Sequence, residues 1–141
     1  MDSSHGVHPP TVIDIVDETF VRADPRRVRD LLDRMSSAVV WPGLTPEVTL
    51  DRGTLGVHWH IDGEVVGRME IWLEEVKEGT LVHHFVQGRL TRAPSPWTTV
   101  IARAWPNWPS ERAATAYERR HARSWKSAIH TLKDHAEGRE R

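Results

Sequence analysis

Three side chains are the candidates for proton transfer in this sequence, and they are His83, His121 and Tyr117. An imidazole titrates near neutral pH, so it can protonate an enolate or accept a proton from a hydroxyl. Tyr117 is the only tyrosine and precedes His121 by one helical turn, which would let its hydroxyl hold a ligand carbonyl. The alternative for each histidine is a hydrogen bond to a backbone carbonyl in a filled core. For Tyr117 the alternative is a place at a cavity mouth, with its hydroxyl in water.

A metal site is the other chemistry that histidines could support. His58 and His60 alternate on one predicted strand, and we place His84 two strands away on the same face. Strands lie about 4.8 Å apart, so His84 would be about 10 Å from His60, too far for joint coordination at Zn–N distances of about 2 Å. The chain has no cysteine and carries no phosphate-binding, dinucleotide-binding or hydrolase motif. We therefore expect no metal and no cofactor.

These side chains need a scaffold, and its first part is a strand followed by a helix. Residues 11–22 are rich in β-branched residues and predict a strand. Asp24 is a good helix N-cap, and Pro25 suits the first helical turn. An apolar stripe at helical spacing follows, and the helix should end before Trp41. The stripe consists of Val28, Leu31, Leu32 and Met35.

From Glu47 onward the apolar period changes to two, which predicts an antiparallel meander. If residues 62–64 and 77–79 form three-residue turns, Trp59 lies opposite Gly67 and Leu73 lies opposite His83. A slip of one residue would exchange His83 for His84 on the inner face. The predicted inner face is Val57, Trp59, Ile61, Met69, Ile71, Leu73, Leu81, His83 and Phe85. The predicted outer face is His58, His60, Arg68, Glu70, Trp72, Glu74, Val82 and His84.

The chain is expected to end in a long amphipathic helix from Ser110 to about Glu137, with Gly138 as its stop. Its apolar stripe is Ala114, Tyr117, His121, Trp125, Ala128, Leu132 and Ala136, widened by Ile129. The preceding segment, 93–109, carries four prolines and three tryptophans and gives no clear element. We expect residues 1–10 to form a polar leader, 11–138 a single domain and 139–141 a tail.

Composition restricts the partners of this domain. The 141 residues include 19 Lys and Arg against 20 Asp and Glu, a formal net charge of −1. Such a balance supplies no field that attracts nucleic acid or anionic lipid. No run of 18 apolar residues occurs, so we expect no integral membrane association and a cytoplasmic location. The sequence leaves open whether the protein forms a homodimer.

The order of these elements resembles the START-like helix-grip (SRPBCC) superfamily, and the similarity covers about residues 11–138. Several segments look like its actinobacterial polyketide cyclase/dehydrase and lipid-transport branch. They are residues 19–25 with Val28, Trp41-Pro42, residues 51–53 with Gly56, Val57 and Trp59, residues 70–74, Trp125-Lys126 and residues 132–134. The segment 93–109 departs from the pattern, because many relatives have further strands there.

The resemblance implies an α+β fold in which a curved antiparallel sheet grips the last helix, with a short helix after the first strand. It also implies a cavity between sheet and helix for a hydrophobic ligand. An apolar sheet face and an apolar helix stripe must in any case bury against each other. The residues expected to line this cavity are Trp59, Ile61, Met69, Ile71, His83, Phe85, Tyr117, His121, Trp125, Ala128 and Ile129.

Three functions agree with this sequence. The first is a binding protein for a hydrophobic or amphipathic small molecule such as a lipid or polyketide, in which Trp59 and Trp125 stack on the ligand or fill the core. The second is an aromatase/cyclase-like enzyme that uses His83, His121 and Tyr117 for proton transfer.

The third function is a protein interaction module that uses the exposed Trp72 and Trp97, or a basic stretch of the last helix. This stretch is Arg119, Arg120, Arg123 and Lys126, which otherwise forms a solvated face paired in part with Glu118. Relatives of the superfamily include binders and enzymes, so the fold alone does not choose among the three.

Overall fold

The computed structural model describes residues 12–91 and 110–139. It has five strands in one antiparallel sheet with the order β1-β5-β4-β3-β2. The elements are β1 (Val12–Val21), α1 (Pro25–Asp33), α2 (Ser37–Val40), β2 (Leu44–Asp51), the 3-10 turn η2 (Gly53–Leu55), β3 (Gly56–Gly63), β4 (Val65–Val76), β5 (Gly79–Leu90) and α4 (Ser110–Ala136). The predicted leader 1–10 and the segment 93–109, with Trp97, Trp105 and Trp108, lie outside the described residues.

Local sequence signals explain where the first helix begins and ends. The Asp24 carboxylate accepts a hydrogen bond of 2.9 Å from the backbone N–H of Arg27, and Pro25 occupies the first turn. The helix was expected to run as far as the residues before Trp41. It instead ends at Asp33, and the short α2 follows after Ser36. The break lets the chain from Arg34 to Ser36 cross over the sheet toward α2.

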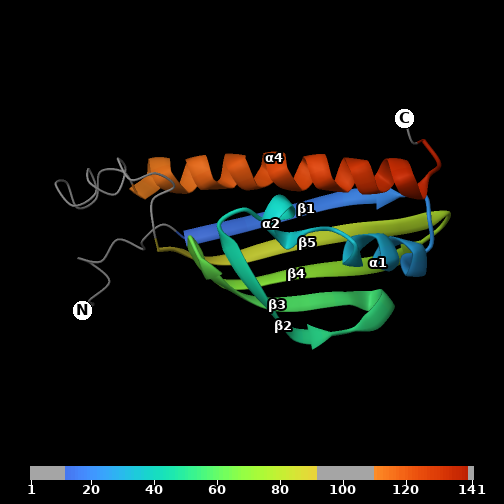
Figure 1. Ribbon diagram of the computed structural model, residues 1–141, viewed down its shortest axis with the longest axis horizontal. Coiled ribbons are helices and arrows are strands. Elements are labelled where there is room, and N and C mark those ends of the chain that lie inside the picture. Colours follow the sequence, from blue (N-terminus) through green and yellow to red (C-terminus); the bar gives the residue numbers. More distant parts are fainter. Residues whose placement is uncertain (1–11, 92–109, 140–141) are drawn as a thin grey trace.

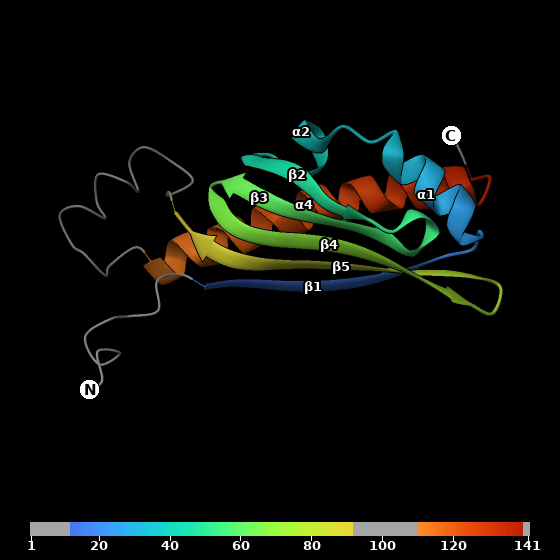
Figure 2. The ribbon, with the colours of Figure 1, turned by 90° about the horizontal axis from the view of Figure 1, so that it is seen from below.

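The helices all lie on one side of the sheet. The long α4 runs along the strands, and α1 and α2 lie beside it toward the β2 end of the sheet (Figure 1). A turn of the molecule by 90° shows the strands curving past α4 (Figure 2). This arrangement is the helix-grip architecture, and the predicted α+β class is confirmed.

The core forms between the inner face of the sheet and the apolar stripe of α4. Its largest fully buried side chain is Trp125, followed by Tyr117. The sheet contributes Ile13, Val21, Ile61, Val65, Met69, Ile71, Leu73, Val82 and Val86. The α4 stripe predicted from the sequence is therefore the face that packs on the sheet, with Tyr117, Trp125, Ile129 and Leu132 buried in it.

The strand register differs from the prediction. Trp59 pairs with Met69 and not with Gly67, a shift of two residues that leaves every side chain of the hairpin on the predicted face. Leu73 pairs with Val82 and not with His83, a shift of one residue that reverses the faces of β5. His84 and Val82 therefore point inward, whereas His83, Phe85 and Leu81 lie on the outer face.

Candidate functional site

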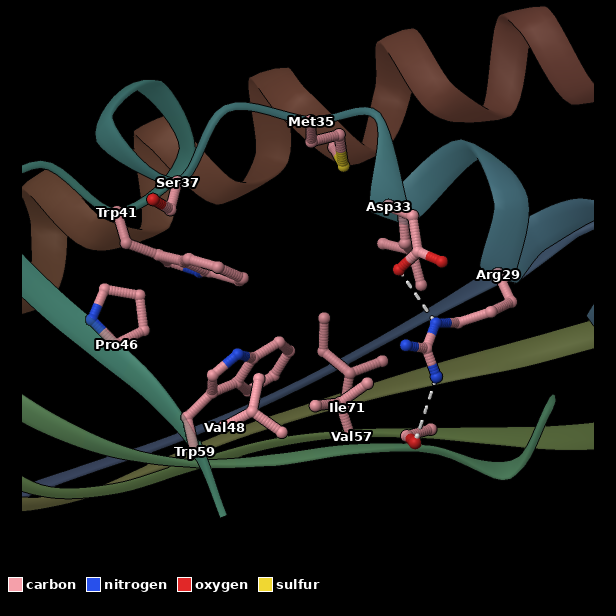
Figure 3. Close-up of a pocket in the computed structure, with 12 residues that line it drawn as sticks. Arg29, Asp33, Met35, Ser37, Trp41, Pro46, Val48, Val57, Trp59 and Ile71 are labelled. Carbon is pink, nitrogen blue, oxygen red and sulfur yellow. Dashed lines mark hydrogen bonds and ion pairs between the residues drawn. The ribbon is translucent and has the colours of Figure 1, made fainter. Parts of the chain in front are cut away.

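A pocket of about 260 Å³ opens between α1, the α1–α2 connection and strands β2, β3 and β4 (Figure 3). Its volume is close to the lower end of the roughly 300–1,000 Å³ typical of ligand sites. Side chains on the three strands form its floor, and Met35 and Ser37 lie above it. The lining residues are Arg29, Leu32, Asp33, Met35, Ser37, Trp41, Pro46, Val48, Gly56, Val57, Trp59 and Ile71. The pocket is thus mostly apolar, with one aromatic end and one polar end.

Two tryptophans form the aromatic end. The rings of Trp41 and Trp59 meet edge to face, with their centroids 5.2 Å apart and an angle of 61° between their planes. Trp41 is 8% exposed, and its Nε1 is buried with no hydrogen-bond partner among the described residues. An unpaired buried N–H costs about 1–3 kcal/mol. Trp41 therefore presents a flat apolar surface at this end, whereas its unpaired Nε1–H is buried out of reach of a water-sized molecule.

Arg29 and Asp33 lie at the opposite end of the pocket (Figure 3). Nε of Arg29 donates to Asp33 Oδ1 at 2.9 Å, and both Nη atoms donate to the two carboxylate oxygens of Asp51 at 2.8 and 3.0 Å. Nη1 also contacts the carbonyl oxygens of Gly53 and Gly56 at 2.7 and 3.3 Å. Arg29 hydrogen bonds hold the pKa of Asp51 at about 2. The guanidinium is thus occupied by protein acceptors.

Gly56 allows the strand β3 to begin beside this polar end. Its φ is 126°, and a Cβ at this position would overlap the backbone oxygen of Ile71 on β4. Only glycine combines this conformation with this close approach. Its carbonyl consequently reaches Arg29, and its Cα borders the pocket.

A chain of buried polar side chains lies beside the pocket, between α4 and β5. Nδ1 of His84 is 3.2 Å from the backbone oxygen of Glu70, which can only accept, so Nδ1 carries the proton. The Nε2 of a neutral His84 is then the acceptor, and His121 Nε2 donates to it across 3.0 Å. His121 Nδ1 is left to accept from the hydroxyl of Tyr117, which lies 3.5 Å away.

Burial keeps His84 and His121 neutral. It lowers the pKa of His84 from 6.5 to about 3, and the neighbouring His121 contributes to this shift. Burial, with the charge of Arg120, lowers the pKa of His121 to about 4. The pKa of the Tyr117 hydroxyl is raised, also mainly by burial. At neutral pH the imidazoles of His84 and His121 and the phenol of Tyr117 are therefore all uncharged.

A second polar group, Asp17 on β1, ties the sheet to α4. Its carboxylate accepts from Trp125 Nε1 at 2.9 Å and pairs with Lys126 Nζ at 2.6 Å. Burial alone would raise the pKa of Asp17, but hydrogen bonds from Lys126 and Trp125 outweigh it and lower the pKa. Trp125 also stacks on His84, with ring centroids 4.2 Å apart. The indole of Trp125 thus acts as a structural support of α4.

His83, by contrast, is held on the outer face of the sheet. Its ring stacks on Trp72, with centroids 4.3 Å apart, and lies parallel to Phe85 at 6.2 Å. Its two nitrogens lie 3.2 Å from Glu18 and 2.9 Å from Glu74. The expected placement of His83 and Phe85 in an inner cavity is therefore wrong, because β5 is shifted by one residue.

The other residues expected to line a cavity take three positions. Trp59 and Ile71 line the pocket. Ala128 borders a shallow groove between α2 and α4, where Met35 also lies. The remaining residues are buried in the core between the sheet and α4, and they are Ile61, Met69, Tyr117, His121, Trp125 and Ile129. The described pocket thus lies to one side of the space where the sequence placed the cavity.

Sequence reasoning did not single out Trp41, Arg29 and Asp33 as site residues. The signal for the last two was their i, i+4 spacing on a helix, which places both on one face. Their shared partner Asp51 is distant in sequence, so no local pattern joins the three. For Trp41 the sequence indicated only that the first helix ends before it. Its contacts with Trp59 and Trp125 depend on how α2 packs.

Two of the basic residues proposed as a docking face are engaged within the protein. Arg120 pairs with Glu64, and Lys126 pairs with Asp17. Among the described residues, no cluster of three or more His, Asp or Glu could hold a metal ion. In the same residues, no helix combines the length and the apolar character needed to cross a membrane.

Comparison with solved structures identifies this architecture in other proteins. A polyketide-cyclase-like protein from Corynebacterium glutamicum has a TM-score of 0.55 at 12% identity, over 88% of this chain and 91% of its own. The di-domain ARO/CYC protein StfQ, from the steffimycin biosynthetic pathway, has a TM-score of 0.62 at 13% identity. The match covers 92% of this chain and 52% of StfQ, so the chain spans about half of that protein.

The Aha1 dimer from Colwellia psychrerythraea also shares the fold, with a TM-score of 0.54 at 14% identity over 92% of this chain and 99% of its own. No protein-family model matches the sequence, and no curated protein matches it either. At these identities the likeness shows the fold alone. The chain therefore has the helix-grip fold that polyketide-cyclase-like, ARO/CYC and Aha1 proteins share.

Proposed function

We propose that this protein binds a small hydrophobic or amphipathic molecule in the pocket between α1 and strands β2, β3 and β4. The observation that carries the proposal is the pocket itself, whose mostly apolar walls end in the paired rings of Trp41 and Trp59. Such pockets combine apolar walls with a few polar groups that orient a ligand. The volume of about 260 Å³ favours a molecule of one or two rings over a long-chain lipid or an extended polyketide.

The same geometry favours binding over proton-transfer catalysis. The residues that line the pocket include no histidine and no tyrosine. Trp41 lies between the pocket and the histidine pair, and its ring centroid is 5.9 Å from that of His84. A ligand in the pocket would thus contact the indole and not an imidazole, which leaves a cyclase activity without a proton donor at hand.

Equilibrium dialysis with naphthalene tests the proposal, because this probe has two rings and no polar group. We expect saturable binding at one site per chain. Val57→Phe places a ring on the pocket floor and should weaken this binding at least tenfold. Val16→Phe is the matched control, since Val16 is 64% exposed on the outer face, and it should bind naphthalene as the unaltered protein does. Thermal unfolding of both variants verifies that they are folded. Equal binding by the two would contradict the proposed site.

Two further expectations stay predictions. The Aha1 structure is that of a dimer, and analytical ultracentrifugation of this protein tests whether it also forms a homodimer. The cytoplasmic location expected from the sequence is tested by cell fractionation.

A further inference from the structure

The charges at the polar end of the pocket restrict the ligand more than its volume does. Arg29 is surrounded by two carboxylates, Asp33 and Asp51, and by two backbone carbonyl oxygens. The formal charges of these three side chains sum to −1. A guanidinium that already donates to five oxygen atoms has little left to offer an anion. A ligand carboxylate or phosphate here would face the like charge of Asp33, which lines the pocket.

The same end suits a ligand that donates a hydrogen bond. Asp33 lines the pocket, and its Oδ1 already accepts from Arg29, so a ligand hydroxyl would be a second donor to a charged acceptor. Hydrogen bonds to charged groups are the stronger ones. Arg29, which also lines the pocket, holds the carboxylate in place through its Nε (Figure 3).

The aromatic end offers ring surface. The Nε1–H of Trp41 is buried out of reach of a water-sized molecule, so a ligand meets the indole ring and not this donor. The faces of Trp41 and Trp59 lie at 61° to each other, and a planar ring can stack on one and meet the edge of the other. The two ends lie across the pocket from each other in Figure 3, with Met35 above and Ile71 below the space between them.

We infer that the ligand is an uncharged aromatic molecule of one or two rings, with a hydroxyl donor at the Asp33 end and its ring surface against Trp41 and Trp59, and that anionic molecules are excluded. This inference rests on the proposed function, since it names the class of molecule that the same pocket takes. On this inference the pocket does not bind fatty acids, acyl phosphates or phospholipids, because their charged groups would have to face Asp33 or remain in solvent.

Three probes with one carbon skeleton test the inference by equilibrium dialysis at pH 7. They are 2,6-dihydroxynaphthalene, naphthalene and the anion 6-hydroxy-2-naphthoate. We expect the dihydroxy compound to bind about tenfold more tightly than naphthalene, which is the effect of one hydrogen bond to a charged acceptor. The anion should bind at least tenfold more weakly than the dihydroxy compound.

Two substitutions assign these preferences to residues. Asp33→Asn removes the carboxylate charge and should reduce the preference for the dihydroxy compound over the anion about tenfold. Asp30→Asn is the matched control, because Asp30 is an exposed residue of the same helix that does not line the pocket. Trp41→Phe keeps a flat ring and removes only a buried N–H, so it should change the binding of 2,6-dihydroxynaphthalene and of naphthalene alike.

The outcomes separate this inference from the proposed function. If naphthalene binds but the anion binds as tightly as the dihydroxy compound, or if Asp33→Asn and Asp30→Asn behave alike, the inference is wrong and the proposed function stands. If none of the three probes binds, both are wrong.

Discussion

Single residues decide the ionisation of the core of this protein. His84 and His121 share a hydrogen bond inside a layer of aromatic rings, and their pKa values fall to about 3 and about 4 because burial disfavours the charged form. The polar groups of His84, His121 and Tyr117 are paired with one another or with the backbone carbonyl of Glu70. Their neutral forms stabilise the fold: protonation of His84 at Nε2 would leave two donors facing each other, and protonation of either ring would place a charge in this buried layer.

The acid dependence of stability follows from these pKa values. In the unfolded chain both imidazoles return to a pKa near 6.5, so the unfolded state binds more protons below that pH. The stability that the neutral pair supplies is therefore fully present above pH 6.5 and is lost as the pH falls toward 4. We expect the free energy of unfolding, measured with urea, to decrease between pH 6 and pH 4.5 by up to about 1.4 kcal/mol per pH unit for each histidine.

Two substitutions on α4 test this assignment. His121→Gln should remove about half of the slope between pH 6 and pH 4.5, because only His84 then remains to be protonated. His130→Gln alters an exposed histidine of the same helix and should leave the slope as it is. Identical slopes in the two variants would show that the buried pair does not control the acid dependence.

At the scale of elements, the sequence indicated the five strands, α1 and α4, but not the separate α2, and it placed the turns between the strands incorrectly. Gly79 suggested a turn residue, whereas it is the first residue of β5 and pairs with Val76. It is small because a Cβ there would overlap the backbone oxygen of Val21 on β1. Glu78 takes the positive φ, 71°, that a glycine was expected to take. Gly79 is thus required by the close approach of β5 to β1, two strands that are distant in sequence, and not by the turn.

The register of β5 can be measured with engineered thiols, because the chain has no cysteine. Phe85→Cys places a thiol on the outer face, and Val86→Cys places one in the core, where Val86 is 0% exposed. A water-soluble maleimide should modify the Phe85→Cys variant at least ~100-fold faster, since the other thiol reacts only after local opening. Faster modification of the Val86→Cys variant would instead support the register predicted from the turns.

The start of β3 depends on one glycine. Gly56→Ala should lower the free energy of unfolding by about 3 kcal/mol, because the residue combines a φ of 126° with a close approach to Ile71. Gly53→Ala is the matched control, since Gly53 also has a positive φ, 64°, but no atoms near its missing Cβ. It should cost about 1 kcal/mol. Equal costs in urea unfolding would mean that the contact with β4 is not tight.

At the scale of the whole molecule, the helix-grip fold was predictable, but the position of the pocket was not. The alternation of β3 and β4 and the stripe on α4 correctly predicted which faces meet, whereas the predicted face of β5 was reversed. They did not show that Tyr117, His121 and Trp125 fill the space between these faces. The described pocket instead lies beside α1, where Trp41 meets Trp59 and where Arg29 links Asp33 to Asp51. Both features join segments that are far apart in sequence.

The central claim is that a small aromatic molecule binds in this pocket and not in the space between α4 and the sheet. Indole N–H resonances in a nitrogen-15 correlation spectrum test it most directly, with each tryptophan assigned by its Phe substitution. Titration with 2,6-dihydroxynaphthalene should shift the signals of Trp41 and Trp59 saturably. The signal of Trp72, on the outer face, should not move. Shifts confined to Trp125, or no saturable shift of Trp41 and Trp59, would contradict the account.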